Sequence, residues 1–304
     1  MRQGFRNDEF LSFLEAELGF AIAAFERLPG RSSSLNFKAV RMSDGFPFVV
    51  KCLPRDCPER VERWRANLKA LEGSKSVGLL FPETCLEYGD CRILFLSFGE
   101  GARKAPEKLT GEDLARLRED YEGLSRAMQR CADPYPPLDG LQWFGKCFSR
   151  QGGWRRRLVG RIVRWRLAGR TSFDRKSTVV VIHGDLHAGN MSFVHGRLSA
   201  VFDVEDLRFG YPTEDWVRFF SCAYEHISPL RVLARRRLLN RFVAFVKESG
   251  YSVEQWRTAI DLYLMLKISG FGLSDLGVWG ILKIILKTRT YVNLRKLARE
   301  ALHA

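Results

Sequence analysis

Residues 179–190 read VVVIHGDLHAGN, and this stretch decides the fold expected for the chain. The four β-branched apolar residues 179–182 predict a buried strand, because such side chains favour extended backbone and pack well within a sheet. The strand runs directly into His183, Gly184 and Asp185, and Asn190 follows five positions after the aspartate. A buried strand that ends in an acid, an amide and two histidines, rather than in a plain polar turn, indicates a functional loop.

A β-hairpin is predicted directly after this loop, in the sequence MSFVHGRLSAVFD (191–203), with its turn at His195-Gly196. The hairpin returns the chain to the end of the sheet where the loop lies, and so brings Asp203 back toward Asp185 and Asn190. Three oxygen-bearing side chains then converge, and oxygen atoms are the ligands that Mg²⁺ prefers. A carboxylate left free of metal could accept the proton of a substrate hydroxyl, as phosphoryl transfer requires. Asp and Asn five residues apart also match the spacing of the protein-kinase catalytic loop.

The first third of the chain mixes helices and strands. The pattern predicts helices over residues 7–18 and 58–73 and strands over 21–29, 36–54 and 84–98. Gly45 in the sequence SDG and Gly89 before Asp90 mark two hairpin turns, because glycine adopts positive φ without strain. Lys51 ends the apolar run FPFVV and therefore lies on a strand, as a lysine that pairs with nucleotide phosphates should.

The rest of the chain is predicted to be mostly helical. Residues 99–110 are polar, contain Gly and Pro, and form a candidate linker, after which helical patterns cover 111–131, 154–169, 213–248 and 253–268. The strand over 179–182 and the hairpin over 191–203 are the two exceptions. We therefore predict an α+β fold with two lobes: a small antiparallel-sheet lobe over residues 1–98 and a larger helical lobe over residues 99–304.

The motifs HGDLHAGN (183–190) and VFDVE (201–205) resemble the aminoglycoside and choline phosphotransferase family of small-molecule kinases, which have a protein-kinase-like fold. The likeness is strongest over residues 180–220 and extends through the order of elements over the whole chain. It implies that ATP and Mg²⁺ are the cofactors. It makes Asp185 the catalytic base, Asn190 and Asp203 the Mg²⁺ ligands, and Lys51 a ligand of the ATP phosphates.

The same resemblance assigns further ATP contacts. It makes ILFLSF (93–98) the hinge whose backbone meets adenine, which includes Leu96 and Phe98. The segment LPGRSSSLNFKAV departs from a GxGxxG loop, yet Ser33 and Ser34 could still approach phosphate, while a plain flexible turn explains the segment equally well. The helical partner expected for Lys51 is taken as Glu62, although Glu59 is near and the family position falls closer to Asn67. Glu205 either lies near a second metal and the acceptor or caps a turn.

Three further polar residues lie in the loop or follow it in the sequence. His183 and His187 are expected to hold the loop by hydrogen bonds and to pack beneath it, rather than to bind metal. Asp215, in the sequence PTEDW, either caps the helix that follows or braces the catalytic loop.

The charge of the chain bears on the acceptor. Lys and Arg number 49 against 35 Asp and Glu, for a formal net charge of +14 over 304 residues, and such a field attracts anions and repels polycations. The segment WRRRLVGRIVRWRLAGR (154–170) mixes arginines with apolar residues at helical spacing, and 281–299 repeats the theme. Arg155, Arg156 and Arg157 are therefore candidates for contact with an anionic acceptor or an anionic membrane, although a solvated basic helix face is the other interpretation. Lipopolysaccharide core sugars would fit, since kinases that act on them share the kinase-like fold.

The cysteine pattern and the distribution of apolar residues bear on the compartment in which the protein is found. The seven cysteines contain no CxxC pair, which is typical of a reducing compartment rather than of a disulfide framework. The first residues lack the apolar stretch of a signal peptide, and no run of apolar residues is long enough to span a bilayer. We expect a cytoplasmic protein with peripheral contact at the inner face of a membrane.

Other functions stay open at this point. A kinase for choline or aminoglycosides has the same motifs but a different acceptor. The basic charge would also suit a nucleic-acid-binding protein, but no binding motif is present. A catalytically inactive kinase-like scaffold conflicts with the presence of Asp185, Asn190 and Asp203 together.

Overall fold

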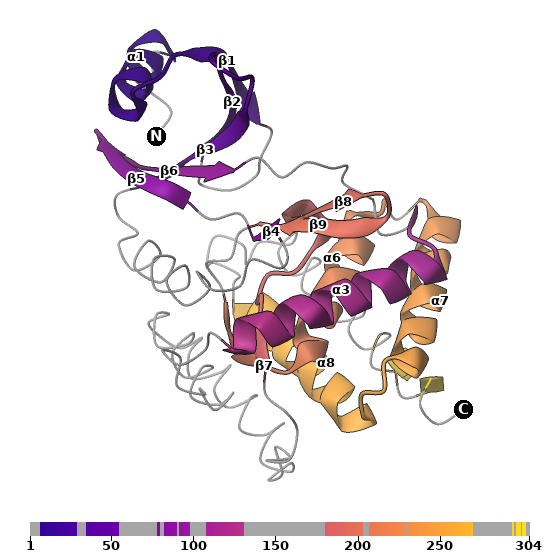
Figure 1. The fold of residues 1–304 in the computed structure, drawn as a ribbon. Coiled ribbons are helices and arrows are strands. Elements are labelled where there is room, and N and C mark those ends of the chain that lie inside the picture. Colours follow the sequence, from indigo (N-terminus) through magenta and orange to yellow (C-terminus); the bar gives the residue numbers. More distant parts are fainter. Residues whose placement is uncertain are drawn as a thin grey trace, which may run out of the picture. The chain divides into compact units, whose positions relative to one another are not determined.

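The computed structural model describes residues 7–28, 35–54, 78–79, 82–89, 91–97, 108–130, 180–202, 207–228, 230–269, 294, 296–298 and 300–301. The chain divides into two compact units. One contains residues 1–101 with 199–205, and the other contains residues 102–198 with 206–304 (Figure 1).

The N-terminal unit contains helix α1 (Asn7–Leu18) and an antiparallel sheet of five strands in the order β1-β2-β3-β6-β5. The strands are β1 (Ile22–Leu28), β2 (Leu35–Arg41), β3 (Pro47–Pro54), β5 (Pro82–Tyr88) and β6 (Cys91–Ser97). Both hairpin turns predicted from glycine are confirmed, since Gly45 has φ 69° and Gly89 has φ 52°. A two-stranded unit would be unstable alone, but five strands covered by a helix bury enough apolar surface to persist.

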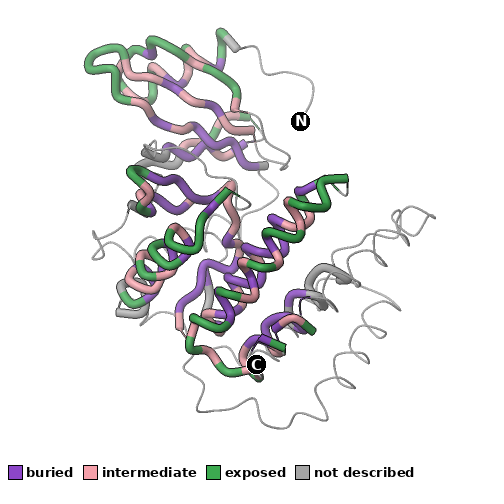
Figure 2. The backbone as a smooth tube through the Cα atoms, turned by 90° about the vertical axis from the view of Figure 1, so that its right-hand side faces the viewer, coloured by how far each residue is buried: buried purple, intermediate pink, exposed green. Residues whose placement is uncertain are grey.

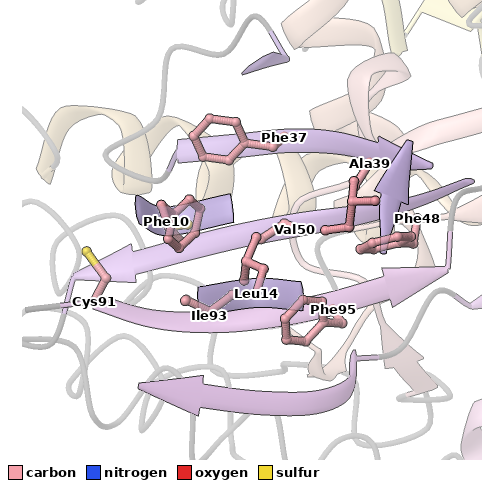
Figure 3. Packing of buried hydrophobic residues seen from close by; sticks show 11 residues of the cluster. Phe10, Leu14, Phe37, Ala39, Phe48, Val50, Cys91, Ile93 and Phe95 are labelled. Carbon is pink, nitrogen blue, oxygen red and sulfur yellow. The ribbon is translucent and has the colours of Figure 1, made fainter. Parts of the chain in front are cut away.

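The core of this unit lies between α1 and one face of the sheet, to which every second side chain of a strand points. Phe48, Val50 and Cys52 of β3 are buried together with Ile93 and Phe95 of β6. Phe10 and Leu14 of α1, four positions apart, pack into the same cluster (Figure 3). Because side chains alternate between faces along a strand, the neighbours of these residues point to the opposite face.

A smaller sheet of three strands has the order β4-β9-β8, built from β4 (Gly78–Leu79), β9 (Arg197–Val201) and β8 (Met191–Val194). The predicted hairpin turn at its tip is confirmed: His195 has φ 49° and Gly196 has φ 80°. Positive φ at both central residues is the turn geometry that matches the twist of paired strands.

The second unit is mostly helical. Its helices are α3 (Gly111–Arg130), α6 (Pro212–His226), α7 (Val232–Glu248) and α8 (Val253–Ser269). Aromatic side chains on α6, α7 and α8 pack edge to face, among them Phe220 with Phe242 and Phe242 with Trp256. Buried and exposed residues alternate along the helices, so that one face of each enters this core (Figure 2). In the described ranges, no helix is both long and apolar enough to cross a membrane.

The predicted α+β class, an antiparallel sheet followed by a helical part, is confirmed, and three details differ. The helical stretch predicted over 213–248 is two helices, because Pro229 lacks an N–H and cannot continue α6. A short strand that was not predicted, β10 (Arg208–Gly210), pairs with β7 (Val180–Ile182) in the second unit. The strand β4 was also not predicted. The helices predicted over 58–73 and 154–169 lie outside the described residues, as do residues 99–107 of the linker predicted over 99–110.

Candidate active site

The loop that follows β7 is positioned by a buried strand. Val181 and Ile182 are buried, and the strand pairs antiparallel with β10. From α3, the Ser125 hydroxyl donates to the backbone carbonyl of Val181 at 2.8 Å. The strand is therefore held on one edge by β10 and tied to α3, which fixes the point from which the loop begins.

Asp215 holds the backbone of the loop. Its buried carboxylate, 1% exposed, accepts the N–H of His183 at 2.7 Å through Oδ2 and the N–H of Gly184 at 2.8 Å through Oδ1. The hydroxyl of Tyr121, from α3, donates to the same Oδ2. Three buried donors thus share one carboxylate, which satisfies all of them and stabilises the negative charge.

The sequence left two roles open for Asp215, and the structure selects the loop brace. The start of α6 is capped by its neighbour: the N–H of Tyr211 donates to Glu214 Oε1 at 2.9 Å, and the N–H of Glu214 donates to the Tyr211 carbonyl at 2.9 Å. This reciprocal arrangement satisfies the helix N-terminus. Asp215, one residue later, points to the loop.

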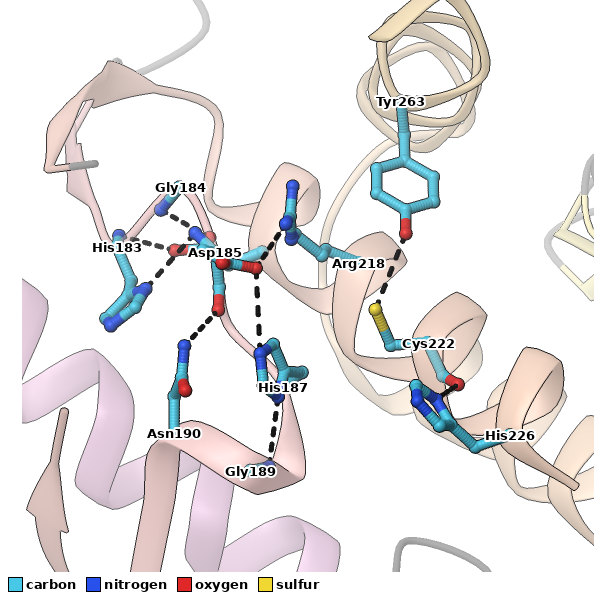
Figure 4. Close-up of polar contacts among 11 residues, drawn as sticks. His183, Gly184, Asp185, His187, Gly189, Asn190, Arg218, Cys222, His226 and Tyr263 are labelled. Atoms are coloured by element: carbon cyan, nitrogen blue, oxygen red, sulfur yellow. Dashed lines mark hydrogen bonds and ion pairs between the residues drawn. The ribbon is translucent and has the colours of Figure 1, made fainter. Parts of the chain in front are cut away.

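Hydrogen bonds within the loop fix its shape (Figure 4). The N–H of Asp185 donates to His183 Nδ1 at 3.1 Å, the N–H of Gly189 donates to His187 Nδ1 at 3.0 Å, and the Asn190 amide donates to the Asp185 carbonyl at 3.1 Å. Gly184 turns the chain at φ 79°, where a side chain would be strained. The expectation that both histidines hold the loop by hydrogen bonds is confirmed.

The carboxylate of Asp185 has its own partners. Arg218, on α6, forms an ion pair with Asp185 Oδ1, and His187 Nε2 lies 3.8 Å from the same oxygen. The guanidinium of Arg218 also lies over the ring of Tyr263 on α8, 5.8 Å from its centroid. Asp215 and Arg218 are three residues apart and so lie on one face of α6. One turn of α6 therefore contacts both the backbone of His183 and Gly184 and the side chain of Asp185.

Lys51 lies in β3 of the N-terminal unit. It stands opposite Asn36 of β2 and Leu94 of β6, and it is 3% exposed. By strand alternation it points away from the face that carries Val50 and Cys52, the face covered by α1. Burial, with a smaller contribution from Cys91, raises the pKa of the adjacent Cys52 thiol to about 12.

The structure brings together part of the predicted site. Asp185 and Asn190 lie on one loop, and Leu96 lies in β6 opposite Val49. Asp203, two residues after the end of β9, lies outside the described residues, as do Ser33, Ser34, Glu62, Phe98, Glu205, Arg155, Arg156 and Arg157. Two residues that hold the loop, Tyr121 and Arg218, were not predicted from the sequence. Arg218 carried a signal, since it follows Asp215 by one helical turn.

The oxygen-bearing side chains of this loop suit a hard cation such as Mg²⁺. The Asn190 amide nitrogen donates a hydrogen bond to the Asp185 carbonyl, and this contact turns the amide oxygen to the other side. Oxygen atoms are the ligands that Mg²⁺ prefers. Asp203 would supply the carboxylate that such an ion requires. The Asn190 amide oxygen is therefore a ligand that fits a Mg²⁺ site, and such an ion would neutralise charge on nucleotide phosphates.

Comparison with known proteins places this geometry in a family. The model of the phosphotransferase enzyme family matches residues 24–243, a range that includes the loop, the hairpin and Lys51. The chain belongs to this family. It is thereby assigned to the ATP-dependent small-molecule kinases, and the protein-kinase-like fold is confirmed.

Solved structures of phosphotransferases and of a choline kinase share the fold. The choline kinase LicA from Streptococcus pneumoniae is 15% identical with a TM-score of 0.57, over 94% of this chain and 99% of its own. The spectinomycin phosphotransferase APH(9)-Ia is 13% identical with a TM-score of 0.56, over 97% and 98%. The aminoglycoside phosphotransferase APH(3'')-Id from Streptomyces rimosus is 19% identical with a TM-score of 0.53, over 88% and 100%. A search of curated proteins found no match.

Proposed function

We propose that this phosphotransferase moves the γ-phosphoryl group of ATP to a hydroxyl group, with Asp185 as the general base. The observation that carries the proposal is the way the Asp185 carboxylate is held. Its backbone is fixed by Asn190 and by His183, its side chain is paired with Arg218, and 25% of that side chain remains exposed. A base acts well only when it is held within hydrogen-bond reach of the proton it removes.

The reaction then follows from the groups in hand. The acceptor hydroxyl donates a hydrogen bond to Asp185, and its proton passes to the carboxylate as the acceptor oxygen attacks the γ-phosphorus. The bond from that phosphorus to the bridging oxygen breaks, and ADP leaves with the electron pair. Asn190 and Asp203 would hold Mg²⁺, and Lys51 would pair with the phosphates.

The remaining ATP contacts are part of the same proposal and rest on the family motifs. Glu62 would pair with Lys51, and Ser33 and Ser34 would approach the phosphates. The backbone of the segment that includes Leu96 and Phe98 would meet adenine.

We further propose an anionic acceptor. The support is the net charge of +14, because a polycationic acceptor would be repelled by such a field. Arg155, Arg156 and Arg157 would contact the acceptor, together with Glu205 beside the transferred group. A phosphorylated or lipid-linked sugar at the inner face of a membrane, such as a lipopolysaccharide core sugar, has the required hydroxyl and charge.

The base is tested by Asp185→Asn. Because the nucleotide is bound by other groups, we expect ATP affinity to be kept while turnover falls by about 10²–10⁴-fold. Asp8→Asn, a change of the same kind at an exposed position of α1, is the matched control and should leave both unchanged. Turnover of Asp185→Asn within about threefold of wild type would place the base elsewhere.

The acceptor class is tested by a turnover screen with Mg²⁺ and ATP. The panel should pair each neutral sugar with its phosphorylated form, and should include lipid-linked glycans, choline and an aminoglycoside. We expect higher kcat/KM for the anionic member of each pair, and a steeper loss of that preference as salt is raised. Preference for choline or the aminoglycoside would refute the anionic acceptor while leaving the phosphotransferase assignment intact.

A further inference from the structure

The start of helix α7 exposes apolar side chains that an aqueous protein surface would normally cover. In the described residues, six large hydrophobic side chains are exposed, and three of them fall within residues 230–233. Leu230 is 91% exposed, Val232 66% and Leu233 70%. Scattered apolar residues need no explanation, but a contiguous group of them marks a surface that binds something.

The same surface is basic. From Ser228 to Lys247 the chain contains five arginines and one lysine and no acidic residue. Arg236 lies four residues after Val232, and Arg237 lies four residues after Leu233, so each exposed arginine stands next to an exposed apolar side chain on the helix. We call Leu230, Arg231, Val232, Leu233, Arg236 and Arg237 the α7 patch.

The opposite face of α7 is the one that enters the core. Leu238, Phe242, Phe245 and Val246 are buried there, and Phe242 and Phe245 both contact Trp256 of α8. The apolar residues of the α7 patch are therefore additional to the core-facing stripe of the helix. An amphipathic helix needs only one apolar stripe to fold, so the patch is not explained by folding.

Hydrogen bonds join the end of α6 to the start of α7, where the α7 patch lies. Arg235 donates to the Ile227 carbonyl at 3.1 Å and 2.8 Å, and its guanidinium lies over the ring of Tyr224, 4.6 Å from the centroid. The N–H of Arg231 donates to the Ser228 carbonyl at 2.9 Å, which closes the turn between α6 and α7. Arg235 thus holds the end of α6 to the start of α7, and the exposed side chains project from a fixed base.

We propose that the α7 patch docks the enzyme on an anionic lipid bilayer. The three aliphatic side chains would enter the boundary between headgroups and acyl chains, and the arginines would pair with lipid phosphates around them. This combination of apolar and basic side chains is the one that binds interfaces, because each contribution alone is weak. A protein partner with an apolar groove would not require exposed arginines beside the apolar side chains, so charge complementarity favours the bilayer.

The proposal does not depend on the proposed reaction, because it concerns a surface and not the catalytic loop. Each basic residue near an anionic bilayer changes the partition coefficient by about fivefold. We therefore expect Arg236→Gln with Arg237→Gln to weaken binding about 25-fold. Leu230→Ser, Val232→Ser and Leu233→Ser together should weaken it by at least about tenfold, because they remove the apolar insertion.

The test is flotation of the full-length protein with vesicles of phosphatidylcholine alone or of phosphatidylcholine and phosphatidylglycerol in equal parts. The matched control is Arg27→Gln with Lys108→Gln, which removes two exposed positive charges outside the α7 patch and gives the same net charge as the arginine variant. Thermal unfolding checks that every variant is folded. Size-exclusion chromatography reports whether any variant changes the oligomeric state.

We expect the wild type and the control to float with the anionic vesicles and not with the neutral ones, with binding that weakens as salt is raised. Both patch variants should remain in the soluble fraction. The proposal is overturned if the wild type does not bind at low salt, or if the control loses as much binding as the arginine variant. It is equally overturned if the serine variant converts an oligomer to a monomer, since a second copy of the chain would then cover the patch.

Discussion

Asp215→Asn provides the sharpest test of how the catalytic loop is held. The substitution keeps the size of the side chain but replaces one carboxylate oxygen with an N–H₂ group. Whichever way the amide turns, that group faces a buried donor: the N–H of Gly184 on one side, or the N–H of His183 and the hydroxyl of Tyr121 on the other. In the better orientation the Gly184 N–H loses its acceptor.

The expected cost follows from these contacts. A hydrogen bond to a charged group contributes about 1.5–3 kcal/mol, and a buried donor left without an acceptor costs about 1–3 kcal/mol. We therefore expect Asp215→Asn to lower the free energy of unfolding by about 2–5 kcal/mol, which corresponds to about 5–15 °C in Tm for a unit of this size. Tyr121→Phe removes one donor and keeps the ring packed on Trp216, 5.3 Å between centroids, so it should cost only about 1–2 kcal/mol.

The assay combines thermal unfolding with steady-state kinetics on the same samples. A shift of about 1 Å at the reacting centre can cost about 10²-fold in rate, so kcat of Asp215→Asn should fall by that order while the KM for ATP changes little. Asp113→Asn, a half-buried acid on the first turn of α3, is the matched control and should cost about 1 kcal/mol without loss of kcat. If Asp215→Asn is as stable as wild type, or if Tyr121→Phe costs more than Asp215→Asn, the brace is wrongly assigned.

Three further results are expected. Because Arg218 positions the Asp185 carboxylate, Arg218→Gln should lower kcat about 10–100-fold with the KM for ATP unchanged. Arg218→Lys keeps the positive charge and should therefore keep a higher kcat than Arg218→Gln. Equal loss of kcat in both variants together with a raised KM would indicate damage to packing instead. Asp203→Ala should raise the Mg²⁺ concentration needed for nucleotide binding more than Asn190→Ala does, because a carboxylate contributes a full charge and an amide only a dipole; equal effects in a Mg²⁺ titration would contradict this. At a pH below 9, Cys52 should be alkylated roughly a thousandfold more slowly in the folded protein than in urea, because its pKa is raised from 9.0 to about 12. The contribution of Cys52 to the free energy of unfolding should decline only as the pH rises from about 9 to 12. Mass spectrometry of the alkylated peptide measures the rate, and rapid labelling of the folded protein would show that the thiol is exposed.

Local patterns were enough to predict most elements and the residues of the loop. The hairpin turns at Gly45 and at His195-Gly196 could be predicted because each needs a conformation that few residues adopt. The loop itself could be found because its polar residues interrupt an apolar strand at a fixed spacing. These features depend only on neighbours in the sequence.

What the sequence could not show depends on contacts between distant residues. Tyr121 and Asp215 are 94 positions apart, and nothing in the helical pattern around Tyr121 distinguishes it from an ordinary core tyrosine. The strands β4 and β10 contain two and three residues, too few for an alternating pattern to be seen. The role of Asp215 was undecided because acids are common in the first turn of any helix. The two roles are separated by the hydrogen bonds that Asp215 accepts from the loop and by the contact of Glu214 at the helix start.

The two histidines in HGDLHAGN accept hydrogen bonds from backbone N–H groups of the loop. A tight loop leaves backbone N–H groups without partners in a sheet or helix, and each needs an acceptor. His183 and His187 each supply a ring nitrogen to an N–H two residues further on, and Asp215 supplies its carboxylate to the two N–H groups at the head of the loop. Since Nδ1 of His187 is an acceptor, the ring proton of its neutral form lies on Nε2, the nitrogen that faces Asp185. The loop's own hydrogen bonds therefore use the imidazole Nδ1 atoms and the Asn190 amide nitrogen. Under the proposed function, the Asn190 amide oxygen would then be left for a metal ion, and the Asp185 carboxylate, oriented by Arg218, for an acceptor hydroxyl.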